Sequence, residues 1–220
     1  MSGKTGILST DTRDQHQSYR VFGLTGGVAS GKSTVAKVFS DKNFVVIDAD
    51  QLTHLLSQPG GLGYEAIIRR FGTSDRGLLR KMVFSDSKAR QDLEAILHPL
   101  IQAESLRLMS EAAKQAANPI IIYEAALLVE KNLASDFEGL IVVEAPKEIR
   151  LQRLLSRDGM SEEIAEKIFA SQATDEERRK VATFTLDNSG SLEQLKKQVE
   201  ELITKLEARN SLTDTHEDGI

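Results

Sequence analysis

The sequence contains no cysteine, which excludes disulfide bonds, thiolate catalysis and cysteine-ligated zinc or iron–sulfur centres. It also has no basic surplus, since 28 Lys and Arg stand against 33 Asp and Glu and the net charge is -5. A protein that coats nucleic acid usually carries a basic excess, so we expect no nucleic-acid partner. What remains is a composition ordinary for a soluble globular protein, with 40% hydrophobic and 28% charged residues among 220.

Long hydrophobic runs are absent as well. No apolar run approaches the roughly 18–20 residues that span a bilayer, and the first 20 residues are too polar for the core of a signal peptide. We therefore expect a cytoplasmic protein that does not associate with membranes, and we expect no specific protein partner. Residues 1–18 are expected to form a flexible leader and residues 207–220 a flexible tail.

Short apolar runs alternate with longer helical patterns along the rest of the chain. Five runs predict strands, at residues 19–25, 44–47, 120–123, 140–143 and 184–186. They are nearly continuously apolar, which is typical of parallel strands covered on both faces. Strands separated by helices favour an α/β fold with right-handed crossovers, so we expect a parallel five-stranded sheet flanked by helices.

Two stretches carry helical patterns of a different kind. Residues 51–117 show almost no strand pattern and are too long for a plain crossover, which predicts an all-helical insertion that builds a substrate pocket. Residues 147–180 mix acids and bases densely and predict further helices. Residues 19–50 and 118–206 then form the core that contains the sheet. Two capping boxes are expected, one at Thr174 with Glu177 and one at Ser191 with Gln194.

The motif with the strongest chemical meaning is Gly26-Gly27-Val28-Ala29-Ser30-Gly31-Lys32-Ser33, which matches G-x-x-x-x-G-K-[ST] in full. A predicted strand precedes it and a predicted helix follows. Glycines let successive backbone N–H groups face one concavity that binds phosphate, and the helix adds its positive N-terminal end. Lys32 can neutralise the β- and γ-phosphates, and the Ser33 hydroxyl can ligate Mg²⁺. The expected ATP-binding residues are Gly26, Gly27, Val28, Ala29, Ser30, Gly31, Lys32, Ser33 and Thr34.

Two carboxylates, Asp48 and Asp50, follow the second predicted strand. Ligands of open α/β sheets bind outside the carboxyl ends of the strands. A carboxylate there can hold Mg²⁺ through water or accept the proton of an attacking hydroxyl. One of the pair can instead cap the helix that follows. We favour Asp50 as the general base, and the spacing leaves open whether Asp48 or Asp50 faces the metal.

Three arginines, Arg150, Arg153 and Arg157, lie three and four residues apart, so one helix could present them together. Cations that close over a transferring phosphate stabilise the transition state, whereas a solvated charged face is the plain alternative. Glu124 ends an apolar run as a Walker-B acid does, which by itself is weak support. His98 next to Pro99 is likewise compatible with a purely structural role.

Taken together, these residues resemble the dephospho-CoA kinase family. The opening segment Gly23–Val35 and the segment Val46-Ile47-Asp48-Ala49-Asp50 are similar to it. The resemblance runs from about residue 20 to 205, through the ordered segments Asp75-Arg76, His98-Pro99-Leu100-Ile101, Leu127-Leu128-Val129-Glu130, Leu151-Gln152-Arg153, Ser171-Gln172-Ala173-Thr174 and Asp187-Asn188-Ser189-Gly190.

The resemblance implies a P-loop kinase that moves the γ-phosphoryl group of ATP to the ribose 3′-hydroxyl of dephospho-CoA, the last step of CoA biosynthesis. It implies a nucleotide-binding core at residues 19–50 and 118–206, with a mobile helical lid at about 147–180. It implies Lys32, Asp50 and Arg153 as catalytic residues and Arg153 with Arg157 as lid arginines. It places Asp48, Asp50, Arg76, His98 and Leu127 on the substrate side. ATP and dephospho-CoA are the expected partners, with Mg²⁺ as cofactor.

The chain departs from the family pattern at a few positions. Ala29 stands where the loop usually has glycine, a change that is tolerable if its φ is negative. Ala126 replaces a proline, Thr183 stands near a missing aspartate, and the segment 71–76 is short.

The main rival function is that of another small-molecule P-loop kinase, acting on a nucleoside or nucleotide. A GTP-driven switch would need an Asn-Lys-x-Asp motif, and an AAA-type motor an apolar run ending in Asp-Glu; neither occurs. A non-catalytic nucleotide-binding module would keep the P-loop without needing Asp50.

Overall fold

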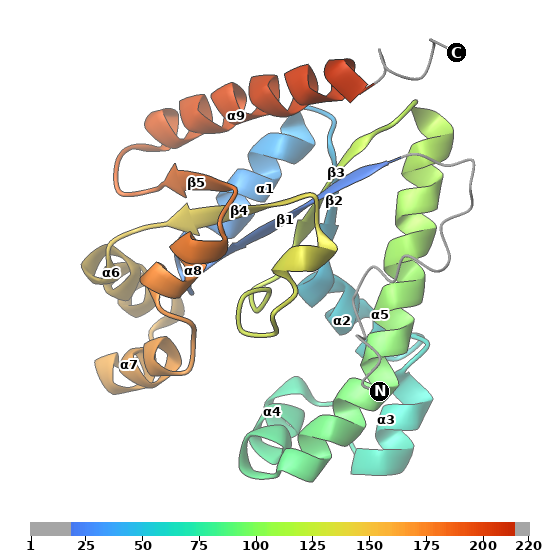
Figure 1. The fold of residues 1–220 in the computed structure, drawn as a ribbon. Helices are drawn as coiled ribbons and strands as arrows, with labels where there is room; N and C mark the ends of the chain where they lie inside the picture. The colour runs from blue at the N-terminus through green and yellow to red at the C-terminus, as the bar shows by residue number, and fades with distance from the viewer. Residues whose placement is uncertain (1–18, 214–220) are drawn as a thin grey trace. The chain divides into compact units, whose positions relative to one another are not determined.

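The computed structural model describes residues 19–213, apart from the side chains of residues 157, 158 and 209–213. Figure 1 shows the elements along the chain. They are β1 (Arg20–Gly26), α1 (Lys32–Asp41), β2 (Val45–Asp48), α2 (Ala49–Ser57), α3 (Tyr64–Phe71), α4 (Arg76–Ser85), α5 (Ser87–Gln115), β3 (Ile120–Glu124), η2 (Ala134–Asp136), β4 (Gly139–Glu144), α6 (Lys147–Asp158), α7 (Glu162–Ala170), α8 (Asp175–Val181), β5 (Phe184–Asp187) and α9 (Leu192–Thr213).

The described residues fall into two compact units, residues 19–47 with 112–213 and residues 48–111. We call the first the sheet unit and the second the helical unit. The function of each segment assigned above, including the substrate role of 51–117 and the lid role of 147–180, stays a prediction. None of the helices within residues 19–213 is both long enough and apolar enough to cross a bilayer.

The five strands form one sheet in the order β2-β3-β1-β4-β5. β1 pairs in parallel with β3 on one side and with β4 on the other, and β4 pairs in parallel with β5. Every residue of β1 and β3 is buried, which explains why their sequences are mainly apolar instead of alternating. The expected parallel five-stranded sheet flanked by helices is confirmed.

One face of this sheet packs on α1 and α9 (Figure 1). The buried cluster between them contains Phe22, Leu24, Val35, Phe39, Ile122, Ile141, Val143, Leu195, Val199, Leu202 and Leu206. The spacing of the last four residues is the helical repeat that packs α9 onto the sheet. The ring of Tyr123, in β3, lies 5.5 Å from the ring of Phe137, which directly follows η2.

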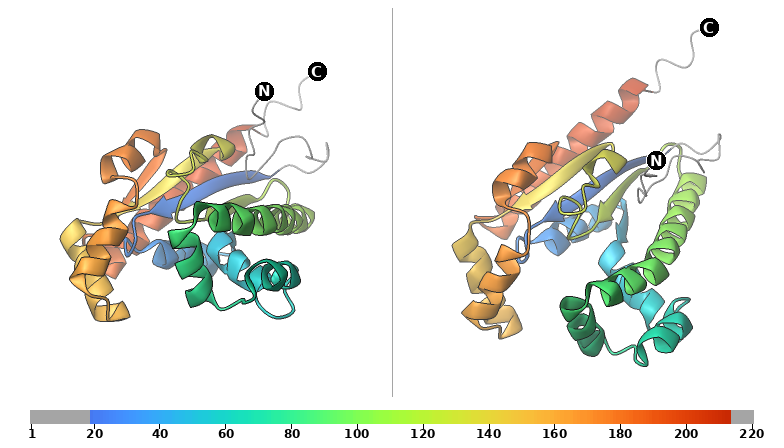
Figure 2. Two further views of the ribbon diagram at one scale, coloured as in Figure 1. Left: turned by 90° about the horizontal axis from the view of Figure 1, so that it is seen from below. Right: turned by 60° about the horizontal axis from the view of Figure 1, so that its bottom comes forward.

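Four of the connections that leave the carboxyl edge of the sheet stay within the sheet unit. The P-loop leaves β1, residues 125–138 leave β3, the segment containing α6, α7 and α8 leaves β4, and residues 188–191 leave β5. Both views of Figure 2 show α6 and α7 side by side. We call α6, α7 and α8 the lid helices after the role that is predicted for them. Parallel strands deliver these connections to one edge, which is where α/β proteins bind ligands.

The helical unit has its own small core. Leu56 of α2, Ile67 of α3, Leu79 of α4 and Leu97 of α5 are buried together. α5 continues through Pro99, which has no backbone N–H to donate within the helix. The expectation of several helices, the longest near residues 86–115, is confirmed.

The expected termini are only partly described. Residues 1–18, expected as a leader, lie outside the described residues, as do 214–220 of the expected tail. The tail was placed too early, because α9 runs to Thr213 and not to residue 206. Residues 207–213 contain neither proline nor glycine, so nothing in the sequence stops the helix there.

Candidate active site

The P-loop joins β1 to α1 by a tight backbone turn. Ser30 N–H donates to Gly27 O at 3.1 Å, and Thr34 N–H donates to Gly31 O at 3.0 Å as the helix begins. Gly31 caps α1 with φ 104°, in the left-handed region that favours glycine. The first turn of α1 has no acidic residue and no side-chain cap. Its N–H groups and helix dipole are therefore suited to bind an anion.

The expectation that Ala29 has a negative φ is wrong, because its φ is 58°. Alanine is therefore not a harmless replacement for glycine at this position. Of the described non-glycine residues with positive φ, the other three are asparagines, Asn43, Asn118 and Asn132. Asparagine tolerates the left-handed region because its short side chain can bond locally, whereas Ala has a Cβ and no such bond. The loop therefore holds a strained residue.

The side chains that act on phosphate in the expected site stand at the start of α1. Lys32 Nζ donates to Gly26 O at 3.1 Å, which folds the side chain back along the loop. Ser33 is exposed in the first turn, and Thr34 follows it half-buried. The ATP-binding role of the loop and of these side chains stays a prediction.

Asn188 and Arg153 brace the carbonyl side of the loop. Asn188 Nδ2 donates to Ser30 O at 2.6 Å. Arg153 Nη1 donates to Ala29 O at 3.2 Å and Ser30 O at 3.3 Å, while Nη2 donates to Asn188 O at 2.9 Å. A Cβ on Gly31 would overlap the Asn188 amide, so this position also needs glycine for space. The two side chains thus tie the loops after β1 and β5 to α6.

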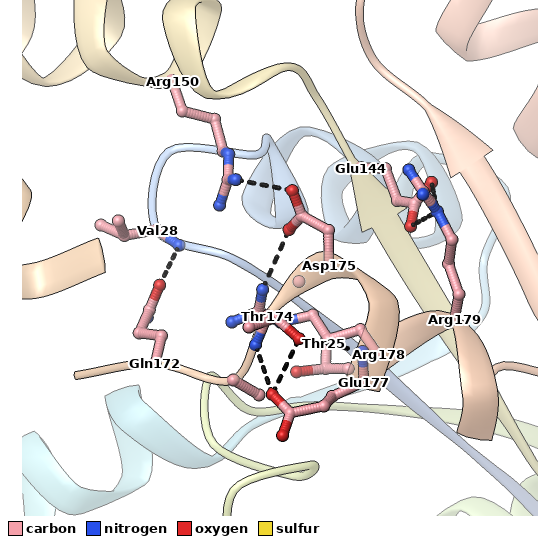
Figure 3. A network of polar contacts seen from close by, with 12 residues as sticks. Thr25, Val28, Glu144, Arg150, Gln172, Thr174, Asp175, Glu177, Arg178 and Arg179 are labelled. Carbon is pink, nitrogen blue, oxygen red and sulfur yellow. Dashed lines mark hydrogen bonds and ion pairs between the residues drawn. The ribbon is translucent and has the colours of Figure 1, made fainter. Parts of the chain in front are cut away.

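A residue of the lid segment contacts an N–H of the loop. Val28 N–H donates to Oε1 of Gln172 at 2.9 Å, as Figure 3 shows. Gln172 lies between α7 and α8. Nothing in the spacing of the sequence pointed to this contact. Only the family resemblance of the segment Ser171–Thr174 drew attention to it.

Two buried arginines lie beside Gly27. Arg150 of α6 and Arg178 of α8 share one carboxylate, Asp175, at 2.9 Å and 3.1 Å (Figure 3). Arg178 Nη2 also donates to Glu130 at 3.2 Å. Burial lowers the pKa of the Arg150 guanidinium from its ordinary value, and the neighbouring Arg178 acts in the same direction against Asp175. The network links two lid helices to the loop after β3.

Sequence reasoning did not find this network. Arg178, Asp175 and Glu130 carry charge in segments where many residues are charged, so composition could not single them out. Arg157 lies on α6 as expected, but its side chain is outside the described residues. Glu124 is buried at the end of β3, as an acid at a strand end would be.

The remaining expected residues belong to other parts of the chain. Asp48 is the N-cap of α2 and accepts from Gln51 N–H at 2.9 Å, while Asp50 is exposed in the first turn of that helix. Arg76 begins α4 and is exposed, as is His98 within α5. Leu127 lies on the loop after β3 with 42% of its surface exposed. The assembly of these five with the P-loop stays a prediction.

Within the part of the chain that the structure describes, the side chains do not by themselves form a complete metal site. Among residues 19–213 there is no group of three or more His, Asp or Glu side chains that could hold a metal ion. Mg²⁺ commonly binds one or two protein oxygens, with phosphate oxygens and water completing its shell. The exposed Ser33 hydroxyl at the start of α1 fits that mode of binding.

The sheet order and the P-loop define the P-loop class of nucleotide-binding proteins. The family model for dephospho-CoA kinase matches residues 20–194. This family match narrows the class to the kinases, which are ATP-dependent phosphotransferases. The chain belongs to the dephospho-CoA kinase family. Enzymes of this kind use ATP together with a divalent metal.

Individual relatives agree with the family model. The dephospho-CoA kinase of Syntrophotalea carbinolica is 39% identical over 207 residues, which cover 90% of this chain and 98% of the relative. That of Frankia casuarinae is 40% identical over 201 residues, covering 88% and 86%.

Solved structures resemble the chain to different degrees. TT1252 from Thermus thermophilus has a TM-score of 0.73 at 32% identity, with 86% of this chain and 99% of that one covered. The dephospho-CoA kinase of Campylobacter jejuni has a TM-score of 0.63 at 29% identity, covering 86% and 98%. A shikimate kinase from Acinetobacter baumannii, at 14% identity and a TM-score of 0.50 with 88% and 96% covered, shares the fold alone.

Proposed function

We propose that this chain transfers the γ-phosphoryl group of ATP to the ribose 3′-hydroxyl of dephospho-CoA and so produces CoA. The observation that carries the proposal is the complete P-loop with its uncapped helix start, in a chain that belongs to the dephospho-CoA kinase family. The rival, a kinase for a free nucleoside or nucleotide, has no observation in its favour.

The P-loop supplies the nucleotide site. Backbone N–H groups of the loop and of the first turn of α1 donate to phosphate oxygens. Lys32, now on Gly26 O, turns to the β- and γ-phosphates when ATP binds. Ser33 holds the divalent ion, for which Mg²⁺ is the proposed identity, with Asp48 or Asp50 reaching it through water. The ion, when bound, neutralises phosphate charge.

Asp50 is the proposed general base. Its neighbour Asp48 already caps α2 through its side chain. A carboxylate in that position stabilises the helix. We propose Asp50, which is exposed in the first turn of α2, as the group that takes the hydroxyl proton. Arg76, His98 and Leu127 are proposed to contact dephospho-CoA.

Arg153 and Arg157 are the proposed lid arginines. Arg153 already touches the P-loop through two carbonyl oxygens. We propose that closure of the lid over both substrates turns its guanidinium toward the phosphates and excludes water there.

We also propose that the protein acts in the cytoplasm.

A panel of hydroxyl acceptors tests the proposed reaction. ADP release is measured with ATP and Mg²⁺ in the presence of dephospho-CoA, adenosine, AMP, shikimate or gluconate. The Lys32→Ala variant, purified in parallel, controls for contaminating kinases. We expect ADP release with dephospho-CoA alone, CoA as the product, and no turnover with a 3′-deoxy analogue. Faster turnover of adenosine or AMP, or turnover of the 3′-deoxy analogue, would contradict the proposal.

A further inference from the structure

Arg150 is a buried guanidinium held in one position. It lies in the first turn of α6, and its side chain is 8% exposed. Asp175 accepts from Nη2 at 2.9 Å, and the Phe169 ring lies 5.2 Å from the guanidinium carbon. The guanidinium remains charged at any physiological pH. Its orientation is therefore fixed by a carboxylate on one side and a ring on another.

The Nη1 group of this guanidinium lies against the P-loop. A Cβ built on Gly27 would overlap Arg150 Nη1 and would lie 3.2 Å from the guanidinium carbon. Any residue other than glycine would push the arginine away. The second position of the loop is thus glycine in order to let a cation approach, a need that the motif pattern does not express.

The hydrogen-bonding capacity of Arg150 is incompletely used. Its Nε is buried and makes no hydrogen bond to any of the described residues. Its one carboxylate partner, Asp175, is shared with the guanidinium of Arg178, whose Nη1 would lie 3.4 Å from the same Gly27 Cβ. Burying a charge is costly unless it is paired and hydrogen-bonded. A site of this kind is suited to an anion placed at the P-loop.

The geometry points to Arg150 as a catalytic residue that contacts the transferred phosphoryl group, in addition to Lys32 and Arg153, with Arg178 positioning it through Asp175. This inference rests on the proposed function. In the step, the bond from phosphorus to the β–γ bridging oxygen breaks, a bond forms to the acceptor hydroxyl oxygen, the hydroxyl proton passes to Asp50, and ADP leaves. Arg150 neither gains nor loses a proton. Its donors stabilise the charge on the equatorial phosphoryl oxygens.

Arg150 and Arg153 would then act from different sides of the loop. Arg153 donates hydrogen bonds to the carbonyl oxygens of Ala29, Ser30 and Asn188. Arg150 has its Nη1 beside Gly27, where a Cβ would overlap it. The two arginines are three residues apart on α6. Arg153 thus contacts carbonyl oxygens of the P-loop, whereas Arg150 lies against Gly27.

The test compares Arg150→Ala with Arg179→Ala, an arginine of the same lid helices that is exposed and paired with Glu144. We expect kcat to fall at least about 10²-fold in Arg150→Ala and to stay within about twofold in Arg179→Ala. Titration of the full-length protein with ADP and Mg²⁺, with and without aluminium fluoride, separates the roles. Affinity for ADP should stay within about threefold, whereas affinity for ADP with aluminium fluoride should fall by about the same factor as kcat.

An Arg150→Lys variant covers the case in which Arg150→Ala does not fold. It keeps the charge beside Asp175 but lacks the planar fork, so we expect partial recovery of aluminium fluoride binding. Loss of ADP affinity equal to the loss of aluminium fluoride affinity in either variant would overturn the proposal, as would a kcat in Arg150→Ala like that of Arg179→Ala. The titration with ADP and aluminium fluoride contains no acceptor. It therefore tests the role of Arg150 separately from the identity of the acceptor, which the panel of hydroxyl acceptors tests.

Discussion

Val28 N–H donates to the side-chain oxygen of Gln172 at 2.9 Å across 144 residues of sequence. The amide oxygen thus satisfies an N–H of a loop whose N–H groups bind phosphate. Gln172 is in the position of a neutral acceptor that a phosphate oxygen can replace.

Gln172→Glu should raise the KM for ATP by about tenfold or more. A carboxylate accepts more strongly than an amide from Val28 N–H and repels the incoming phosphates, and two like charges about 4 Å apart near a protein surface repel by several kcal/mol. Steady-state kinetics at varied ATP provide the measurement. Gln115→Glu, at the exposed end of α5, makes the same charge change as a control. A KM equal to that of the control would show that Gln172 does not compete with ATP.

Lys32→Ala should lower kcat by roughly 10²–10³-fold or more while the fold is kept, because the phosphates lose their fixed cation. Lys37→Ala is the matched control, since Lys37 is exposed on the same helix and pairs only with Asp41 among the residues described. Turnover and circular dichroism are measured on both. Near-parent turnover in a folded Lys32→Ala would remove the P-loop assignment.

Asp50→Asn should lower kcat by about 10²–10⁴-fold with little change in ATP affinity, since Asn keeps the shape but cannot take a proton. Asp48→Asn should keep stability, because Asn is as good an N-cap as Asp, whereas Asp48→Ala should lose about 1 kcal/mol of stability. Asp48→Asn should also keep activity if Asp50 is the acid that reaches the divalent ion. Rates and thermal unfolding are measured for the three variants. A severe Asp48→Asn beside a mild Asp50→Asn would reverse the two roles.

Much of the fold could be predicted because it depends on local patterns. Continuous apolar runs marked the strands, since both faces of the sheet are covered. The capping box of Thr174 and Glu177 is confirmed. So is that of Ser191 and Gln194, with reciprocal bonds at 2.8 Å and 3.3 Å. A capping box is a contact over three residues, so the sequence contains all of it.

The contacts around the P-loop could not be predicted, because they join residues far apart in sequence. Spacing placed Arg150 and Arg153 on one side of a helix, but it could not tell that one meets Gly27 and the other meets carbonyl oxygens. The positive φ of Ala29 could not be predicted from the sequence either. It depends on how the loop closes onto α1, not on the residue, which would itself prefer a negative φ.

Arg153→Ala should depress kcat by at least tenfold with only a modest change in the affinity of the substrate-free enzyme for ATP, if the lid closes only over both substrates. Arg153→Lys should recover part of the loss, since a point charge cannot make the paired bonds to Ser30 O and Asn188 O. Kinetics and ATP titration are measured together. A kcat within about threefold of the parent would end the proposed role.

Ala29→Gly should stabilise the protein by about 1 kcal/mol, because a left-handed conformation costs an L-residue with a Cβ roughly that amount, and glycine gives back only part of it through the entropy of the unfolded chain. Ala95→Gly, exposed within α5, is the control and should lose about 1 kcal/mol, since glycine is disfavoured inside a helix. Urea unfolding at constant slope gives both values. The opposite signs follow from φ alone, because both substitutions remove one methyl group. If Ala29→Gly is as destabilising as the control, the loop does not hold Ala29 at φ 58° in solution.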